Sequence, residues 1–126
     1  MRKKVLIIED SFDIGESLKL LIEYEGYEAV VASGAVEGFD KAREEAPDLI
    51  LMDLSLPDGN GIKLTRDLRS QPQTSNIPIL CVSSYTDGIE DKVLEAGCNE
   101  VFSKTSFMTE FAPTLKKALR LQPSTL

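Results

Sequence analysis

Short apolar runs and stretches with helical hydrophobic spacing alternate five times along this chain, and this alternation limits the possible folds more than any other feature. The apolar runs, which we predict to be strands, lie at residues 5–8, 29–31, 49–52, 77–82 and 101–102. Apolar residues recur at helical spacing within residues 11–26, 36–46, 61–70, 87–97 and a last segment that ends near residue 121. Strands that alternate with helices form a parallel sheet with helices on both faces. The sequence therefore predicts an α/β fold: a (βα)5 doubly wound parallel five-stranded sheet with the flavodoxin-like strand order 2-1-3-4-5.

The length and composition fit one globular domain. The chain has 126 residues, of which 42% are hydrophobic and 28% are charged. We expect residues 1–121 to form the domain and residues 122–126 to form a short C-terminal tail. No apolar run is long enough to span a bilayer. The first apolar run stops at Glu9, so we predict no signal peptide.

Charge and histidine content exclude several classes of function. The chain has 14 basic and 21 acidic residues, a net charge of −7, which disfavours binding to nucleic acid or to an anionic membrane. It has no histidine, which excludes a Ser-His-Asp triad, an HExxH zinc site and a role as a phosphohistidine carrier. Cys81 and Cys98 lie in apolar stretches without metal-ligand spacing. We expect two buried thiols in a reducing, cytoplasmic setting.

Polar residues follow four of the five predicted strands, where each strand ends. They are Glu9 and Asp10 after the first strand, Asp53 after the third, Ser83 and Ser84 after the fourth, and Lys104 after the fifth. In a parallel sheet these ends share one edge, and the crevice between the first and third strands is where such folds bind ligands. We therefore expect three carboxylates, a hydroxyl and a lysine to converge in one crevice.

Three neighbouring carboxylates repel one another unless a cation lies among them. Mg²⁺ prefers oxygen ligands and keeps several waters, so it fits such a cluster. A metal beside Asp53 suits phosphoryl chemistry, in which Asp53 is the nucleophile that forms an acyl phosphate. Taken singly, Asp10 could be a helix cap and Lys104 a surface charge. Their joint occurrence at neighbouring strand ends favours the phosphoacceptor interpretation.

This ordered set of residues resembles the receiver domain of bacterial response regulators over nearly the whole chain. The matching segments are Val5-Leu6-Ile7-Ile8-Glu9-Asp10, Pro47-Asp48-Leu49-Ile50-Leu51-Met52-Asp53, Leu56-Pro57-Asp58-Gly59-Asn60-Gly61, Ile77-Pro78-Ile79, Ser83-Ser84 and Lys104. No single segment is specific, whereas the set in this order is.

The resemblance implies a role for each matching residue. Asp53 matches the residue that accepts a phosphoryl group from a histidine kinase or phosphotransfer protein. The implied Mg²⁺ ligands are Glu9, Asp10, Asp53 and the backbone carbonyl of Ser55. Ser83 matches the switch hydroxyl, and Lys104 matches the lysine that contacts phosphoryl oxygen. The implied function is a signalling switch that changes its binding to a downstream protein and is no enzyme beyond its own phosphorylation and dephosphorylation.

Several positions are expected to modulate this chemistry. The family usually has proline after the lysine, whereas this chain has Thr105. A cis peptide bond before a residue other than proline costs about 3–4 kcal/mol. We therefore expect the Lys104–Thr105 bond to be either trans or a strained cis bond. Val101 stands where the family often has an aromatic residue, which removes the usual aromatic readout. Tyr85 either shields the acyl phosphate from water or is an ordinary exposed loop residue, and Ser84 is a further modulating position.

Pro113 interrupts the last helical pattern, so that helix either begins near residues 109–110 or is kinked.

Other functions also remain open at this point. The chain could be the receiver part of a larger regulator or hybrid kinase, or a phosphate-independent binding module of the same fold. A small phosphatase is disfavoured because Ser55 is not an acid. A flavin or nucleotide domain is disfavoured because no glycine-rich loop follows the first strand.

Overall fold

The computed structural model describes residues 2–56, 59–83 and 89–120, and its main sheet has the predicted topology. The five parallel strands are β1 (Lys4–Ile8), β2 (Glu28–Ala32), β3 (Leu49–Asp53), β6 (Ile79–Ser83) and β7 (Glu100–Ser103). They lie in the order β2-β1-β3-β6-β7, which is the order 2-1-3-4-5 of the main strands. The predicted fold class is therefore confirmed.

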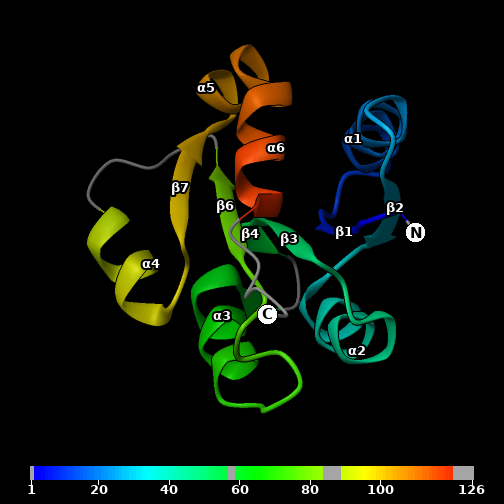
Figure 1. Cartoon of the computed structure of the whole chain (residues 1–126). Helices are drawn as coiled ribbons and strands as arrows, with labels where there is room; N and C mark the ends of the chain where they lie inside the picture. Colours follow the sequence, from blue (N-terminus) through cyan, green and yellow to red (C-terminus); the bar gives the residue numbers. More distant parts are fainter. Residues whose placement is uncertain (1, 57–58, 84–88, 121–126) are drawn as a thin grey trace.

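Helices cover both faces of this sheet. They are α1 (Phe12–Tyr24), α2 (Ala35–Glu45), α3 (Gly61–Arg69), α4 (Glu90–Ala96), α5 (Lys104–Thr109) and α6 (Phe111–Arg120). Figure 1 shows α1, α5 and α6 on one side of the sheet and α2, α3 and α4 on the other. None of these helices has the length and apolar character that a membrane span requires.

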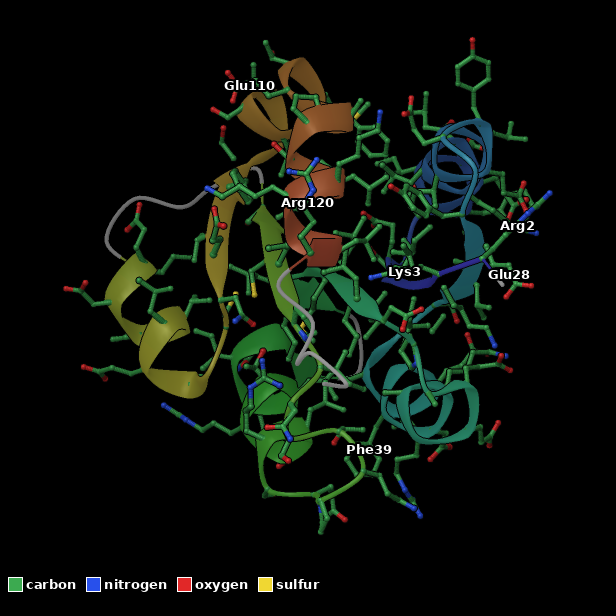
Figure 2. The ribbon with its side chains drawn as sticks, viewed as in Figure 1. Arg2, Lys3, Glu28, Phe39, Glu110 and Arg120 are labelled. Atoms are coloured by element: carbon green, nitrogen blue, oxygen red, sulfur yellow. The ribbon has the colours of Figure 1, made fainter. Side chains whose placement is uncertain are left out.

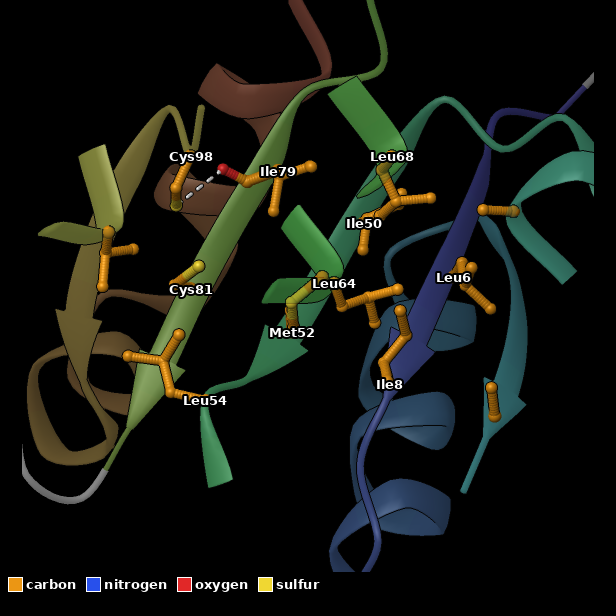
Figure 3. Packing of buried hydrophobic residues seen from close by; sticks show 13 residues of the cluster. Leu6, Ile8, Ile50, Met52, Leu54, Leu64, Leu68, Ile79, Cys81 and Cys98 are labelled. Atoms are coloured by element: carbon orange, nitrogen blue, oxygen red, sulfur yellow. Dashed lines mark hydrogen bonds between the residues drawn. The ribbon is translucent and has the colours of Figure 1, made fainter. Parts of the chain in front are cut away.

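Two apolar layers hold the helices on the sheet, because successive side chains of a strand point to opposite faces. In β1, Val5 and Ile7 pack toward α1, α5 and α6, whereas Leu6 and Ile8 pack toward α2, α3 and α4. All four side chains are at most 1% exposed. Figure 3 shows the second of these layers. Burial on both faces explains why the strands are continuously apolar in the sequence.

The helix ends follow local chemistry. Ser11 caps α1, since its side-chain oxygen accepts a hydrogen bond from the Ile14 amide at 3.3 Å. Gly26 follows α1 with φ of 97°, and Gly97 caps α4 with φ of 118°, a backbone region that glycine adopts without strain. The sequence Asp87-Gly88-Ile89-Glu90 predicts a capping box at the start of α4, but residues 87–88 lie outside the described residues.

The C-terminal helical segment differs from the single helix that the sequence predicted. It consists of α5 and α6, separated at Glu110, where φ is −119° and ψ is 36°. Ser103 starts α5 by accepting a hydrogen bond from the Ser106 amide at 3.1 Å. Pro113 is the third residue of α6. The backbone N–H groups of the first helical turn have no acceptor within the helix, so proline loses no helical hydrogen bond there. Of the two expectations for Pro113, a helix that begins shortly before it is confirmed.

A small hairpin after β3 was not predicted. Strands β4 (Ser55–Leu56) and β5 (Gly59–Asn60) pair in antiparallel orientation, where the sequence Pro57-Asp58-Gly59-Asn60-Gly61 predicts only a turn. Each strand has two residues, too few for alternation to be visible in the sequence. The hairpin carries the chain from the end of β3 to the start of α3.

The strands begin at the opposite edge of the sheet from the predicted crevice. Arg2, Lys3 and Glu28 lie at this edge, where the Glu28 amide donates a hydrogen bond to the Lys3 carbonyl at 2.9 Å (Figure 2). The predicted domain boundary at residue 121 falls beyond the described residues and stays a prediction.

Candidate functional site

Three carboxylates meet at the C-terminal edge of the sheet, between β1 and β3. Glu9 and Asp10 follow β1, and Asp53 is the last residue of β3. Because β1 and β3 are neighbours and Ile8 is paired with Met52, Glu9 and Asp53 leave the sheet side by side. One carboxylate oxygen from each of the three residues lies within 4.8 Å of the others. Glu9 and Asp53 are buried, whereas Asp10 is exposed.

Lys104 brings a positive charge to this cluster. It directly follows β7 and is the first residue of α5. Its ammonium nitrogen lies 3.9 Å from Glu9 Oε1 and 3.9 Å from Asp53 Oδ2. One ammonium group cannot balance the combined charge of the carboxylates, so the cluster keeps an excess of negative charge. This oxygen-only donor set fits a hard metal cation, and the acidic triad can bind a metal ion.

The carboxyl group of Glu9 has an unusual proton affinity. Burial raises the pKa of Glu9 to about 7, because the ionised form loses hydration, and the charge of Asp53 acts in the same direction. The Ser11 amide donates a hydrogen bond to Glu9 Oε2 at 3.1 Å and opposes the rise. A metal cation at this site would favour the ionised form of Glu9.

Substitution of Glu9 by glutamine is expected to stabilise the metal-free protein increasingly as the pH rises. The folded state holds the Glu9 proton up to about pH 7, whereas an unfolded glutamate loses it near pH 4.5. Wild-type stability therefore falls across this window, and the advantage of Glu9→Gln grows by up to about 3 kcal/mol. Urea unfolding with a chelator at several pH values between 4.5 and 8 measures it. Saturating Mg²⁺ should shrink the difference, and a pH-independent difference would contradict the assignment.

The structure describes some of the other predicted site residues and leaves two of them undescribed. Ser83 is buried at the end of β6, which pairs with β3. Val101 lies in β7 and packs against the apolar layer below α2, α3 and α4. The Lys104–Thr105 bond is trans, since the described residues contain no cis peptide bond. Ser84 and Tyr85 lie outside the described residues.

Gly61 contributes to the site in a way that the sequence pattern did not predict. A Cβ atom on Gly61 would lie 2.9 Å from the backbone oxygen of Asp53 and 3.0 Å from the Leu54 Cα. The Gly61 amide also donates a hydrogen bond to the Leu54 carbonyl at 2.9 Å. The start of α3 thus packs directly on the backbone that carries Asp53. The signal in the sequence was a glycine at the end of a turn, which by itself indicates only conformational freedom.

Comparison with known proteins identifies this arrangement. The sequence profile of the response regulator receiver domain matches residues 5–116. The chain belongs to the response regulator receiver domain family. One relative is the polar-differentiation response regulator DivK of Brucella ovis, which is 35% identical over 120 residues, covering 94% of this chain and 98% of DivK.

Solved receiver structures have the same fold. The BeF3-activated N-terminal receiver domain of Klebsiella pneumoniae RstA is 28% identical, with a TM-score of 0.85 over 94% of this chain and 99% of that domain. The chemotaxis protein CheY4 of Vibrio cholerae is 24% identical, with a TM-score of 0.87 over 94% of this chain and 99% of CheY4, and supports the fold alone. The receiver family consists of signalling phosphoacceptors of two-component systems rather than conventional enzymes, and it implies a kinase partner in general.

Proposed function

We propose that this receiver domain is a stand-alone signalling switch in which Asp53 accepts a phosphoryl group from a histidine kinase or phosphotransfer protein. The observation that carries the proposal is the meeting of Glu9, Asp10, Asp53 and Lys104 at one edge of the sheet in a receiver-family chain. An oxygen of Asp53 attacks phosphorus, a P–O bond forms, and the P–N bond of the donor phosphohistidine breaks. The leaving imidazole nitrogen takes up a proton.

The cofactor in this proposal is Mg²⁺, held by Glu9, Asp10, Asp53 and the backbone carbonyl of Ser55. Mg²⁺ held by these residues would supply positive charge that neutralises the phosphoryl oxygens during transfer. The support is the oxygen-only donor set and the excess negative charge described above. Ser55 lies in β4, two residues after Asp53 in the chain.

Two further side chains complete the proposed phosphoryl site. Lys104, 3.9 Å from Asp53 Oδ2, is suited to contact a phosphoryl oxygen on Asp53. The hydroxyl of Ser83 is the proposed switch group that moves toward the phosphoryl group. Ser84, Tyr85, Val101 and Thr105 are the proposed modulating positions. Val101 in particular has no aromatic ring whose orientation could change with the phosphorylation state.

Phosphorylation then biases a two-state equilibrium and changes binding to a downstream protein. A stand-alone switch is supported by the match to DivK, which covers 98% of that protein. We propose a cytoplasmic protein that signals by protein–protein contact and not through nucleic acid or a membrane, in keeping with its net charge of −7.

Incubation with acetyl phosphate tests the function without knowledge of the kinase. Wild-type protein is expected to gain one phosphoryl group in the presence of Mg²⁺ and none in the presence of a chelator. Intact-mass spectrometry measures the gain directly, which matters because the chain has no tryptophan for a quenching assay. If folded, Mg²⁺-binding protein gained no phosphoryl group, the phosphoacceptor function would be wrong and a phosphate-independent binding module would remain.

A further inference from the structure

An apolar cleft lies beside the acidic cluster, between α1 and α5. Its volume is about 360 Å³. For comparison, an apolar cavity of about 150 Å³ is enough to bind benzene. Strand residues including Ile7, Leu51 and Val82 form part of its lining, together with Leu18 of α1 and Phe107 of α5. The cleft therefore has room for a small organic molecule on the α1 and α5 side of the sheet.

Close packing of α1 on β2 contributes to the space for this cleft. Gly15 is buried in α1, and a Cβ atom there would lie only 3.0 Å from Val31 Cγ1 in β2. The missing side chain lets α1 approach β2 closely. Ile14 of α1 and Met108 of α5 line the cleft and are 40% and 49% exposed.

The polar part of the cleft carries excess negative charge. Glu9, Asp13 and Asp53 contribute three carboxyl groups to the lining, whereas Lys104 contributes the single ammonium group. Ser17 of α1 adds a hydroxyl group. A ligand that matches both parts has an apolar body for the aliphatic and aromatic walls and a positive charge for the carboxylates. A neutral or anionic molecule of the same shape lacks this match.

We propose that the cleft between α1 and α5 binds a small organic cation with an apolar body, of the alkylamine or arylamine class. The ammonium group of the ligand lies at Glu9, Asp13 and Asp53, and its hydrocarbon part lies against Ile14, Leu18 and Met108, the accessible apolar residues of the lining. The ligand and a divalent metal ion use the same carboxylates, so each weakens the binding of the other by the same factor. This site goes beyond the proposed function, because binding of the amine requires no phosphoryl transfer.

The test compares three probes of one shape on the metal-free full chain: phenylbutylamine, phenylbutanol and phenylbutyrate. Calorimetry is expected to give an affinity for the amine about tenfold higher than for the alcohol, and weaker binding still for the acid. Amide chemical-shift changes should map to α1, α5 and the ends of β1 and β3. Added Mg²⁺ should weaken binding of the amine much more than binding of the alcohol. No phosphodonor is present, so these results are independent of whether Asp53 is phosphorylated.

Substitutions on α1 locate the site. Ser17→Phe places a ring in the cleft from an exposed position, and we expect it to weaken binding of the amine about tenfold. The matched control is Leu20→Phe, which adds a ring at a 68% exposed position of the same helix outside the lining and should leave binding unchanged. Asp13→Asn should narrow the preference for the amine over the alcohol, and it supplies a second variant if Ser17→Phe unfolds.

Three results would overturn the proposal. Equal affinities for the amine, the alcohol and the acid would refute the role of the carboxylates. Chemical-shift changes elsewhere, or an amine affinity unaffected by Ser17→Phe in a folded protein, would place the probe at another site. Failure of all three probes to bind at millimolar concentration would exclude a small cation as the occupant and leave an apolar side chain of a partner protein in its place.

Discussion

Asp53→Asn is expected to abolish phosphoryl uptake from acetyl phosphate at every Mg²⁺ concentration. The amide of asparagine is not a nucleophile of the kind that forms an acyl phosphate, and it carries no charge to attract the metal. Asp53 is also the one carboxylate of the triad that belongs to the strand β3 itself. Intact-mass spectrometry on wild type and variant under identical conditions measures the difference.

A matched aspartate controls for effects of the substitution itself. Asp91→Asn changes an exposed residue of α4, so it should leave phosphoryl uptake unchanged. Circular dichroism should show that both variants keep the wild-type fold. If folded Asp53→Asn still gained a phosphoryl group, the acceptor would be another residue. Fragmentation of the phosphorylated protein in the mass spectrometer would identify that residue.

The second large effect concerns Arg69, at the end of α3 and away from the acidic cluster. Its guanidinium donates hydrogen bonds to the carbonyls of Gly97, Thr74 and Ser75 at 2.9, 3.2 and 3.1 Å. It also donates to Asn99 Oδ1 at 3.0 Å, an oxygen that accepts a further bond from the Ile79 amide at 2.8 Å. One side chain thus joins α3, the loop after it, the end of α4 and the start of β6.

Arg69→Ala is expected to lower the free energy of unfolding by about 2–4 kcal/mol. The substitution removes the donors of three backbone carbonyls in one step, and part-buried carbonyls are costly to leave unpaired. Arg69→Lys keeps the charge but not the planar arrangement of donors, so an intermediate loss is expected. Urea unfolding followed by circular dichroism measures both values.

The control for this prediction lies on the same helix. Arg66 is exposed, and Arg66→Ala should change the free energy of unfolding by no more than about 0.5 kcal/mol. Should Arg69→Ala prove as stable as Arg66→Ala, the hydrogen bonds of Arg69 would contribute nothing to the folded state beyond what water provides. In that case the order of the loop after α3 would have to come from Thr74, which is also buried.

The fold was predictable because the strands are buried on both faces and therefore stand out as continuous apolar runs. Val5, Leu6, Leu49 and Ile50 are all fully buried, so neither face of β1 or β3 needed a polar residue there. The same logic located the site. A polar residue such as Asp53 directly after a buried strand stands at the sheet edge, and parallel strands share that edge.

What the sequence did not predict depends on distances between separate elements. The raised pKa of Glu9 follows mainly from its burial in the folded chain, and no local sequence pattern encodes that burial. The cleft follows from the position of α1 relative to α5, which Gly15 permits but does not signal. The break between α5 and α6 at Glu110 falls within a run of ordinary helical spacing. Pro113 indicated that the helix is interrupted nearby but did not indicate the residue at which the break occurs.

The burial of both thiols makes this protein well suited to chemical labelling. Cys81 is 0% and Cys98 is 5% exposed, and hydrogen bonding to Cys98 together with burial raises the pKa of the Cys81 thiol. Cys98 Sγ lies 2.9 Å from the Glu100 carbonyl oxygen, inside the packed region that Figure 3 shows. A maleimide dye or a spin label should therefore react selectively with a cysteine introduced at an exposed residue such as Glu95 of α4. Spectroscopy on the labelled protein can then test whether that helix moves when the proposed phosphorylation occurs, without altering the native core.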